Sequence, residues 1–460
     1  MEKYDGIIIG FGKGGKTLAG DLANAGKRIA IIEKSDNMYG GTCINIACIP
    51  SKSLVNSAAH TKIKEPLSFQ EKAKLYQKAI EEKSNLTSRL RKKNFDKLNN
   101  HNNVTIYTGT ATFRSPNQVS VELEHETVVL EGEYIFINTG AIPILPDIEG
   151  IENNDRVYTS STLMDLEKLP ERLAIIGAGY IGLEFASIYS DFGSQVTVFQ
   201  DGMEFLSRED KDIAEDILQV LKEKGIDFKL GSKINAVRNQ SKEAIISYFD
   251  IVAGENKEHP ADAVLIATGR KPNIEGLNLA AAGVELTTRS AVKVDEYLRT
   301  STPNIWAMGD VTGGLQFTYI SLDDYRIVRS QLIDKDVKRS TKERVNIPYS
   351  IFINPPYSRV GLNEREAIEQ EFEVKIAKLP VASIPKAQVL QQTKGILKAV
   401  IDAKTNLILG AMLFCAESHE MINVIKLAID AGLPYTFLRD QIFTHPTMSE
   451  SFNDLFTTIN

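Results

Sequence analysis

The pattern of apolar and polar positions marks a buried strand at the start of the chain. The apolar run Tyr4–Ile9 leads into Gly10, Gly12 and Gly15, then into a stretch with helical spacing and a second apolar run that ends at Glu33. Strand, G-x-G-x-x-G, helix, strand and terminal acid form the pattern of a dinucleotide-binding unit. The glycines let the backbone approach a pyrophosphate at a helix N-terminus, and Glu33 is placed to accept hydrogen bonds from a ribose.

The same pattern recurs further along the chain, in "ERLAIIGAGYIGLEFASIYSDFGSQVTVFQD". Predicted strands Leu173–Ile176 and Gln195–Phe199 flank a second triplet, formed by Gly177, Gly179 and Gly182. From Gly10 to Glu33 is 23 positions, and from Gly177 to Gln200 is also 23, so Gln200 occupies the position that Glu33 occupies in the first copy. Two dinucleotide sites in one chain favour one held and one exchanging cofactor, most simply a flavin and a nicotinamide.

Gln200 bears on which nicotinamide binds. An acid there would bind a free 2′-hydroxyl and repel a 2′-phosphate, whereas glutamine is neutral. Arg208 is near enough in sequence to bind a phosphate, although Asp201 argues the other way. We predict that NADPH is preferred and NADH is also used; in the alternative, Gln200 is merely solvated and the site discriminates poorly.

Two patterns near the C-terminus predict further elements. "LKAVIDAKTNLILGAMLF" has two apolar runs flanking a turn, as in a β-hairpin, and "AESHEMINVIKLAIDAG" has helical apolar spacing that ends at a glycine. Cys415, in the apolar run "AMLFCA", is predicted to be a buried strand residue.

Composition narrows the class of protein. With 460 residues, 43% hydrophobic and 25% charged, the chain has the composition of a globular protein of two or three domains. Its net charge of −7 argues against non-specific nucleic-acid binding. No apolar run approaches the roughly 20 residues of a membrane helix, and the N-terminal run is too short for a signal peptide. We therefore expect a cytoplasmic protein without a nucleic-acid or membrane partner.

The stretch "GGTCINIACIPSK", residues 40–52, holds Cys43 and Cys48, two of only three cysteines. A metal clip is disfavoured because no histidine or third cysteine is nearby, and a structural staple because cytoplasmic cysteines stay reduced. A redox couple is favoured. Five residues of regular helix advance about 7.5 Å, whereas bridged Cα atoms are usually under about 7 Å apart. We expect Cys43 in a glycine-led turn or a distorted first turn, Pro50 in a first helical turn or at a kink, and thiol pKa values lowered near a helix N-terminus.

The order Gly-Gly-Thr-Cys-x-Asn-x-x-Cys-x-Pro-x-Lys, placed between two dinucleotide units, resembles the class I pyridine nucleotide–disulfide oxidoreductases. That family includes glutathione reductase, dihydrolipoamide dehydrogenase and mercuric reductase. "ATGRKPN", "TPNIWAMGDVTG" and "THPTMSE" resemble three further motifs of the family.

The resemblance implies an α/β fold like that of glutathione reductase, with two Rossmann-like domains and a C-terminal α+β dimerisation domain. It places an FAD domain at 1–146 and 269–344, an NAD(P)H domain at 147–268 and an interface domain at 345–460. The charged stretch "DKDVKRSTKERVN" marks the last border.

The resemblance also implies residue roles. Cys48 is the thiol next to a tightly bound FAD, and Cys43 is the interchange thiol that meets substrate. Lys52 lies near the flavin and pairs with Glu184. His445, oriented by Glu450, is the acid–base that reaches the partner subunit's cysteines, so the enzyme is a homodimer. The further cofactor-binding residues implied are Gly41, Thr42, Thr139, Gly140, Gly269 and Asp310, the last of these on the ribityl chain.

One longer stretch, "GGLQFTYISLDDYRIVR" at Gly313–Arg329, is similar to the bacterial reactive-chlorine-resistance flavoproteins, a branch that includes hypothiocyanous acid reductase and has been linked to copper(II) reduction. It implies reduction of a small oxidant, most simply hypothiocyanous acid, in defence against host or environmental oxidants.

The alternatives are a glutathione- or lipoamide-type disulfide reductase, a Cu(II) or Hg(II) reductase, a soluble transhydrogenase and a non-enzymatic redox sensor. The tail lacks the vicinal cysteines of mercuric reductases, and Gln200 departs from the acid of dihydrolipoamide dehydrogenases. Ala47 stands where many members have glycine, which leaves the turn between the cysteines unexplained.

Overall fold

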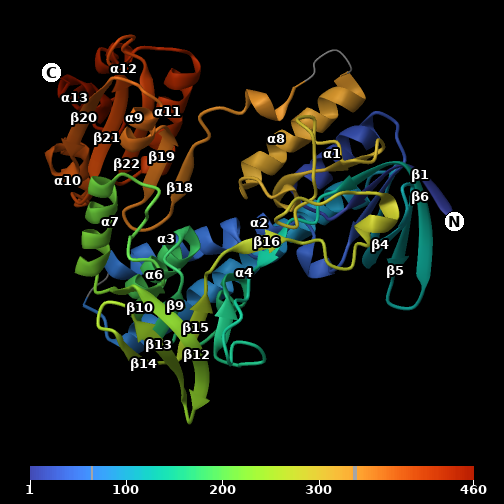
Figure 1. Cartoon of the computed structure of the whole chain (residues 1–460), viewed down its shortest axis with the longest axis horizontal. Coiled ribbons are helices and arrows are strands. Elements are labelled where there is room, and N and C mark those ends of the chain that lie inside the picture. Colours follow the sequence, from blue (N-terminus) through green and yellow to red (C-terminus); the bar gives the residue numbers. More distant parts are fainter. Residues whose placement is uncertain (64–65, 335–338, 460) are drawn as a thin grey trace. The chain divides into compact units, whose positions relative to one another are not determined.

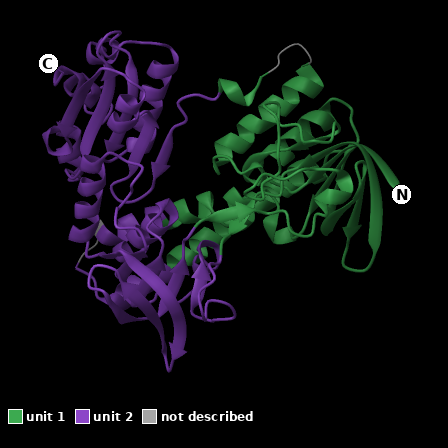
Figure 2. Ribbon diagram, in the orientation of Figure 1, with its two compact units in different colours: residues 1–54, 78–144, 269–343 green, residues 55–77, 145–268, 344–460 purple. Residues whose placement is uncertain are grey.

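The structure, a computed structural model, describes residues 1–63, 66–334 and 339–459. It forms two compact units (Figure 2), of which unit 1 comprises residues 1–54, 78–144 and 269–343 and unit 2 comprises residues 55–77, 145–268 and 344–460. Positions 335–338 of the charged stretch that was expected to mark a domain border lie outside the described residues. The four-segment domain division therefore stays a prediction.

Unit 1 is built on a mostly parallel sheet (Figure 1) with the order β3-β2-β1-β6-β5-β4 and with β17 also paired to β6. β1, β2, β3, β6 and β17 run parallel, whereas β4 and β5 are antiparallel additions. The bounds are β1 Glu2–Ile9, β2 Ile29–Glu33, β3 Val104–Thr108, β4 Thr110–Ser115, β5 Gln118–Glu122, β6 Thr127–Ile137 and β17 Ile305–Ala307. The predicted first strand and the strand that ends at Glu33 are confirmed.

Helices α1 (Lys13–Asn24) and α8 (Thr318–Arg329) lie side by side on this sheet (Figure 1). Leu18 and Leu22 of α1 pack with Ile8 and Ile31 of the sheet, and Ile327 of α8 joins the same core. Strands buried on both faces need continuous apolar sequence, which is why β1 reads as an isoleucine run. The remaining elements of unit 1 include the pair β7 (Ala141–Pro143) and β16 (Arg270–Pro272) and most of α4 (Phe69–Asn99).

Unit 2 contains the second dinucleotide fold, an all-parallel sheet with the order β11-β10-β9-β15-β8. Its strands are β8 Val157–Thr159, β9 Arg172–Ile176, β10 Gln195–Gln200, β11 Asp227–Leu230 and β15 Ala263–Ile266, and α6 (Tyr180–Phe192) links β9 to β10. An antiparallel sheet of β12 (Ser232–Gln240), β13 (Glu243–Asp250) and β14 (Glu255–Ala261) shares a core with it through Ile246 and Phe199. The repeat predicted from the glycine spacing is confirmed.

The C-terminal part of unit 2 is a five-stranded antiparallel sheet with the order β18-β19-β22-β21-β20. Its strands are β18 Tyr349–Ile351, β19 Tyr357–Gly361, β20 Val374–Pro380, β21 Ile396–Asp402 and β22 Ile408–Phe414. Helix α11 (Ser418–Asp430) packs on β19 and β22, and α13 (Ser451–Thr457) packs on β20. The predicted hairpin is β21–β22, and the predicted helix is α11. Cys415 is fully buried but lies one residue beyond β22.

Candidate functional site

The first glycine motif forms the tight turn between β1 and α1. Gly10 has φ +101°, and a Cβ there would lie 2.4 Å from the carbonyl oxygen of Asn138. Glu33, at the end of β2, accepts the Phe11 N–H at 2.9 Å, and burial raises the pKa of its carboxyl against the backbone hydrogen bonds it accepts. A carboxylate fixed beside this loop is placed as a ribose acceptor should be.

Asn138 organises this loop and was missed in the sequence. Its Oδ1 accepts the Gly15 N–H at 2.9 Å, and its Nδ2 donates to the Met308 carbonyl at 2.7 Å. The side chain is buried, so both hydrogen bonds are protected from water. The only signal was one amide residue directly after the apolar run that forms β6.

The second glycine motif repeats the first in detail. Gly177 has φ +110°, and a Cβ on Gly182 would lie 2.0 Å from the Gly177 carbonyl oxygen. Among the residues that the structure describes, no atom would lie within 4 Å of a Cβ on Gly179. Gln200 Oε1 accepts the Ala178 N–H at 3.0 Å, which is the contact that Glu33 makes with Phe11. The equivalence of Gln200 and Glu33, inferred from spacing, is therefore also an equivalence of position.

Around Gln200, two charged residues were candidates for nucleotide recognition. Gln200 Nε2 donates to Asp201 Oδ1 at 3.0 Å, and Asp201 also accepts the Gly202 N–H at 2.8 Å. Arg208 is exposed, and its carbonyl accepts from Arg359 Nη1 at 3.1 Å and from Asn363 Nδ2 at 3.0 Å. The backbone that carries the Arg208 guanidinium is thus anchored from the C-terminal sheet of the same unit.

Asp310 lies in a short 3₁₀ turn (Gly309–Thr312) that follows β17. Burial raises the pKa of Asp310, and the positive charge of Arg270 opposes this shift. The turn is held by a hydrogen bond from the Gly309 N–H to the Asp324 carboxylate of α8, at 2.5 Å. The Arg270 guanidinium is itself held by the Ala141 carbonyl, to which it donates at 2.5 Å. Arg270 and Asp324 were not among the predicted site residues, although both lie within motifs that were recognised.

Thr139 and Gly140 follow β6 and contact the segment after Gly269. Thr139 Oγ1 donates to the Asn273 carbonyl at 2.7 Å, and the Asn273 N–H donates to the Gly140 carbonyl at 2.9 Å. The Ile144 N–H donates to the Gly269 carbonyl at 3.0 Å. Both glycines have positive φ, and Thr42 Oγ1 would lie 3.8 Å from a Cβ on Gly140. These predicted cofactor-binding residues are therefore neighbours within unit 1.

Cys43 and Cys48 lie on two separate helices. Gly40 and Gly41, with φ +95° and +86°, lead into α2 (Thr42–Asn45), and Cys48 is the first residue of α3 (Cys48–Ile63). This confirms that the two cysteines do not share one regular helix and that Pro50 lies in a first turn. Ala47 does not have a positive φ, and its carbonyl accepts the Ser51 N–H at 3.0 Å. The link between the helices therefore needs no glycine at this position.

Neither cysteine forms a disulfide in this structure, and the two side chains interact with each other. The pKa of Cys43 is raised, first by its hydrogen bond with Cys48, then by burial and by negative charge on Cys48; hydrogen bonding by Thr318 and the charge of Lys16 oppose this shift. Cys48 Sγ lies 3.4 Å from Thr318 Oγ1 at the start of α8. The lowered pKa expected from a helix N-terminus is wrong for Cys43, because the hydrogen bond with Cys48 and burial raise the pKa of its thiol.

The remaining predicted catalytic residues lie on α3, on α6 and in the C-terminal segment. Lys52 lies in the second turn of α3; Glu184 on α6 is 8% exposed and accepts the Phe352 N–H at 2.9 Å. Lys52 and Glu184 belong to different units, so their pairing stays a prediction. His445 Nδ1 lies 2.8 Å from Glu450 Oε2, while Glu450 Oε1 accepts the Thr447 N–H at 3.1 Å. The His445 side chain is 72% exposed in the single chain.

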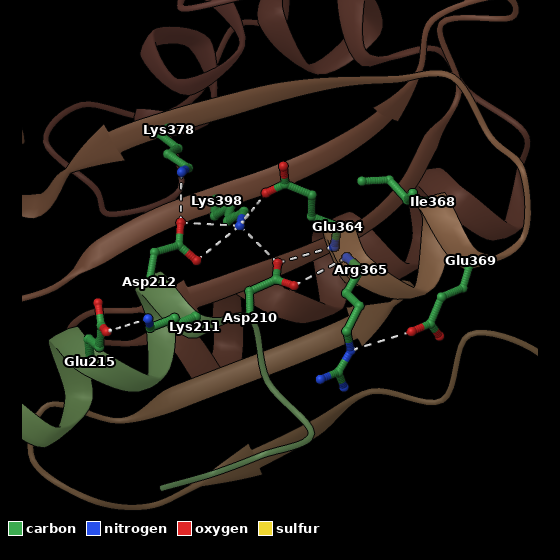
Figure 3. A pocket seen from close by; sticks show the side chains of 10 residues that line it. All are labelled: Asp210, Lys211, Asp212, Glu215, Glu364, Arg365, Ile368, Glu369, Lys378 and Lys398. Carbon is green, nitrogen blue, oxygen red and sulfur yellow. Dashed lines mark hydrogen bonds and ion pairs between the residues drawn. The ribbon is translucent and has the colours of Figure 1, made fainter. Parts of the chain in front are cut away.

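A pocket of about 600 Å³ lies within unit 2 (Figure 3). Lys398, 1% exposed, forms ion pairs with Asp210 and Glu364 at 2.8 Å and with Asp212 at 3.0 Å. These pairs connect β21 to the start of α7 (Lys211–Glu223) and of α9 (Glu364–Glu369). The five carboxylates and four cations that line this pocket are paired with one another, which indicates a structural role.

Within residues 1–63, 66–334 and 339–459, no group of three or more His, Cys, Asp or Glu side chains could hold a metal ion. Of the helices described, none has the length and apolar character needed to cross a membrane.

The chain matches known proteins over its full length. The family described as pyridine nucleotide-disulphide oxidoreductase matches residues 4–324, and the dimerisation domain of that family matches residues 347–456. The chain is 48% identical to the Escherichia coli protein "Probable pyridine nucleotide-disulfide oxidoreductase RclA" over 100% of both chains. It is 34% identical to the mercuric reductase of Lysinibacillus sphaericus, over 98% of this chain and 81% of that one.

A solved structure gives the same likeness in three dimensions. It is described as "Cu(II) complex of HOCl-induced flavoprotein disulfide reductase RclA from Escherichia coli" and aligns with a TM-score of 0.94, at 48% identity over 99% of each chain.

Proposed function

The chain belongs to the pyridine nucleotide-disulphide oxidoreductase family, and on this premise we propose that it reduces hypothiocyanous acid, a small sulfur-centred oxidant, through Cys43 and Cys48. As a member of that family it is a flavoprotein oxidoreductase that uses FAD and a pyridine nucleotide, and it has the homodimer interface domain. The thiol pair beside Thr318 carries the proposal, because one thiol is available to attack and the other to resolve. The similarity to an HOCl-induced relative supports an oxidant as substrate.

Unit 1 offers the residues that would hold FAD. The glycine turn after β1 would face the pyrophosphate, Glu33 a ribose and Asp310 the ribityl chain. The fit is close: a Cβ on Gly41 would lie 2.7 Å from the Cα of Gly12, so the cysteine loop and the first glycine loop meet without side chains between them. Bound FAD supplies the transfer of electrons from the nicotinamide to the disulfide.

The proposed reaction balances in two steps. The Cys43 thiolate attacks the sulfur of hypothiocyanous acid, and the S–O bond breaks; the leaving hydroxide takes a proton from His445 of the partner subunit and departs as water. Cys48 then attacks the sulfur of Cys43, releases thiocyanate and forms the Cys43–Cys48 disulfide. One NADPH restores the dithiol. Such a reaction serves defence against oxidants in the cytoplasm.

NADPH is proposed as the preferred reductant. Gln200 occupies the place of the ribose-binding acid without its charge, and the exposed Arg208 side chain lies on an anchored backbone. Comparing kcat/KM for NADPH and NADH, in the wild type and in Arg208→Ala, tests this. A strong preference for NADH, or no effect of the substitution on NADPH use, would contradict it.

The experiment for the substrate is stopped-flow reduction by NADPH, followed by mixing with hypothiocyanous acid, glutathione disulfide, lipoamide, Hg(II) and Cu(II) in turn. We expect fast reoxidation by hypothiocyanous acid and loss of turnover in Cys43→Ser. Slow reaction with hypothiocyanous acid beside fast reduction of a disulfide would favour the disulfide-reductase alternative. Turnover retained in Cys43→Ser would favour a transhydrogenase.

Copper(II) reduction is the second candidate, favoured by the solved copper complex of the E. coli relative and by the mercuric reductase likeness. A Cu(II) complex is also solved for the C43S mutant of that relative, so Cu(II) is proposed as a substrate without assigning its contact to Cys43. NADPH-dependent Cu(I) formation by the wild type tests this candidate, and its absence would argue against it.

A further inference from the structure

We propose that Lys16 is a positioning residue for Cys43: it holds the loop that precedes the cysteine and stabilises the Cys43 thiolate. The inference rests on the proposed function only in taking Cys43 as the attacking thiol.

Lys16 lies in the first turns of α1, directly after Gly15 of the glycine motif. Its Nζ donates to the Gly40 carbonyl at 2.9 Å. Gly40 and Gly41 both have positive φ, and Gly41 approaches Gly12 so closely that a Cβ would lie 2.7 Å from the Gly12 Cα. The lysine therefore links the helix that begins at the first glycine loop to the loop from which α2 begins.

The carbonyls on either side of Gly40 are held by a neutral side chain. Asn45 Nδ2 donates to the carbonyls of Tyr39 and Gly41, both at 3.0 Å, and Asn45 Oδ1 accepts from Arg91 Nε at 2.9 Å. At Gly40 the donor is an ammonium. A neutral amide would hold that carbonyl equally well, so the added consequence of lysine is its charge.

That charge acts on Cys43. Burial lowers the pKa of Lys16 to about 8, repulsion from Lys13 of α1 and Lys97 of α4 acts in the same direction, and negative charge on Cys43 of α2 opposes it. Reciprocally, the ammonium favours the Cys43 thiolate against the hydrogen bond with Cys48 and burial, which disfavour it. Because a lysine is charged below its pKa, this support is present below about pH 8 and is lost above it.

The test measures Cys43 reactivity in the FAD-loaded enzyme, without any oxidant substrate. In a Cys48→Ser background Cys43 is the reactive thiol, since Cys415 is fully buried. The rate of Cys43 alkylation by iodoacetamide is followed by peptide mass spectrometry from about pH 5 to about pH 10. Lys16→Gln keeps a donor for the Gly40 carbonyl but loses the charge, Lys16→Arg keeps both, and Lys97→Gln removes an exposed lysine charge nearby.

We expect Lys16→Gln to move the alkylation profile up by about one pH unit, a fall in rate of roughly tenfold near neutral pH. Lys16→Arg should keep the low-pH profile, and Lys97→Gln, which removes a charge that repels Lys16, should not move the profile upward. An unchanged profile in Lys16→Gln, or an equal shift in Lys97→Gln, overturns the inference. If Lys16→Gln loses its flavin, Lys16→Arg decides, since a profile displaced upward in that variant contradicts the role of charge.

The two proposals fail separately. A shifted alkylation profile together with no turnover of hypothiocyanous acid by the wild type refutes the proposed substrate and leaves the role of Lys16 standing. Turnover of hypothiocyanous acid with an unshifted profile does the reverse.

Discussion

At the scale of single residues, Gln200 and Glu33 make equivalent hydrogen bonds to the backbone, but the glutamine side chain is neutral and the glutamate side chain is an acid. Each side-chain oxygen accepts the N–H of the residue that follows the first glycine of its motif, at 3.0 Å and 2.9 Å. Gln200→Glu should therefore keep its geometry while placing a carboxylate where a 2′-phosphate would lie. We expect the ratio of kcat/KM for NADPH over NADH to fall roughly tenfold or more.

The control for this change is flavin content, which should equal that of the wild type because Gln200 belongs to the second motif. An unchanged nucleotide ratio in Gln200→Glu would mean that the 2′-position is not near this residue.

Glu450 is expected to act through His445. A carboxylate on Nδ1 fixes the imidazole tautomer that leaves Nε2 free to exchange a proton, and it stabilises the imidazolium. Glu450→Gln keeps an acceptor for the Thr447 N–H but loses the charge, so we expect oxidant turnover to fall roughly tenfold or more. Flavin reduction by NADPH, measured in the same stopped-flow instrument, should not change. Equal loss in both half-reactions would indicate a structural defect instead.

The site residues that could not be predicted from the sequence are those whose hydrogen-bond partners belong to no common motif with them. Glu33 was predicted because its spacing from Gly10 is part of a motif. Asn138 and Lys16 became visible only when the fold brought the end of β6 and the cysteine loop against the first glycine loop. A buried amide or a half-buried lysine has no spacing rule, because no motif links its position to that of its partner, 123 positions away for Asn138 and 24 for Lys16.

At the scale of elements, Lys398 connects β21 to the starts of α7 and α9. The Lys398 side chain is only 1% exposed, and its removal would leave Asp210 and Glu364 without their shared cation. Lys398→Met should lower the free energy of unfolding by about 3–5 kcal/mol, measured from denaturant midpoints. The matched control is Lys394→Met, which breaks the exposed pair with Glu223 and should cost under about 1 kcal/mol. Equal effects would contradict a structural role for the buried cluster.

The same cluster predicts acid sensitivity. Burial raises the pKa of Asp212, but hydrogen bonds from Lys378 and Lys398 outweigh it and hold the pKa below its ordinary value. A carboxyl with a lowered pKa contributes stability that is present above the unfolded pKa and is lost as pH falls through the folded one. Melting temperature should therefore fall below about pH 4, and Asp212→Asn should reduce that dependence. A parallel pH dependence in both proteins would assign the acid sensitivity to other groups.

Helices and strands were predicted correctly where a run of apolar residues is bounded by a glycine, a charged residue or a turn. β1, β9 and β10 have apolar runs bounded by glycines or charge, and β21–β22 have a turn between them. The antiparallel sheet β12–β14 was not predicted: β13 alternates buried and more exposed positions as a half-buried strand should, but β12 and β14 are rich in charged and polar residues, and no glycine motif marks any of the three. Helix geometry correctly separated the two cysteines, but it could not give the direction of the Cys43 pKa, which depends on the neighbouring thiol.

At the scale of the whole molecule, each compact unit is assembled from three separate segments of the chain. Residues 145–268 interrupt the segments of unit 1, and residues 344–460 join unit 2. The order of the motifs predicted that the chain returns to its first domain after the second. It could not predict that residues 344–460 form one compact unit with residues 145–268, because that grouping depends on contacts between side chains far apart in sequence. Residues 347–456, which include His445, match a dimerisation domain, so we expect His445 to act in the dimer.

A site shared between subunits makes a quantitative prediction for mixed dimers. Cys43→Ser and His445→Gln homodimers should each have little oxidant turnover. After the two variants are co-expressed in equal amounts, about half of the dimers are mixed, and each mixed dimer has one site with both Cys43 and His445. Turnover should therefore recover to about a quarter of the wild-type value. If His445 acted on the cysteines of its own chain, no site of a mixed dimer would be intact, and turnover would stay at the level of the separate variants.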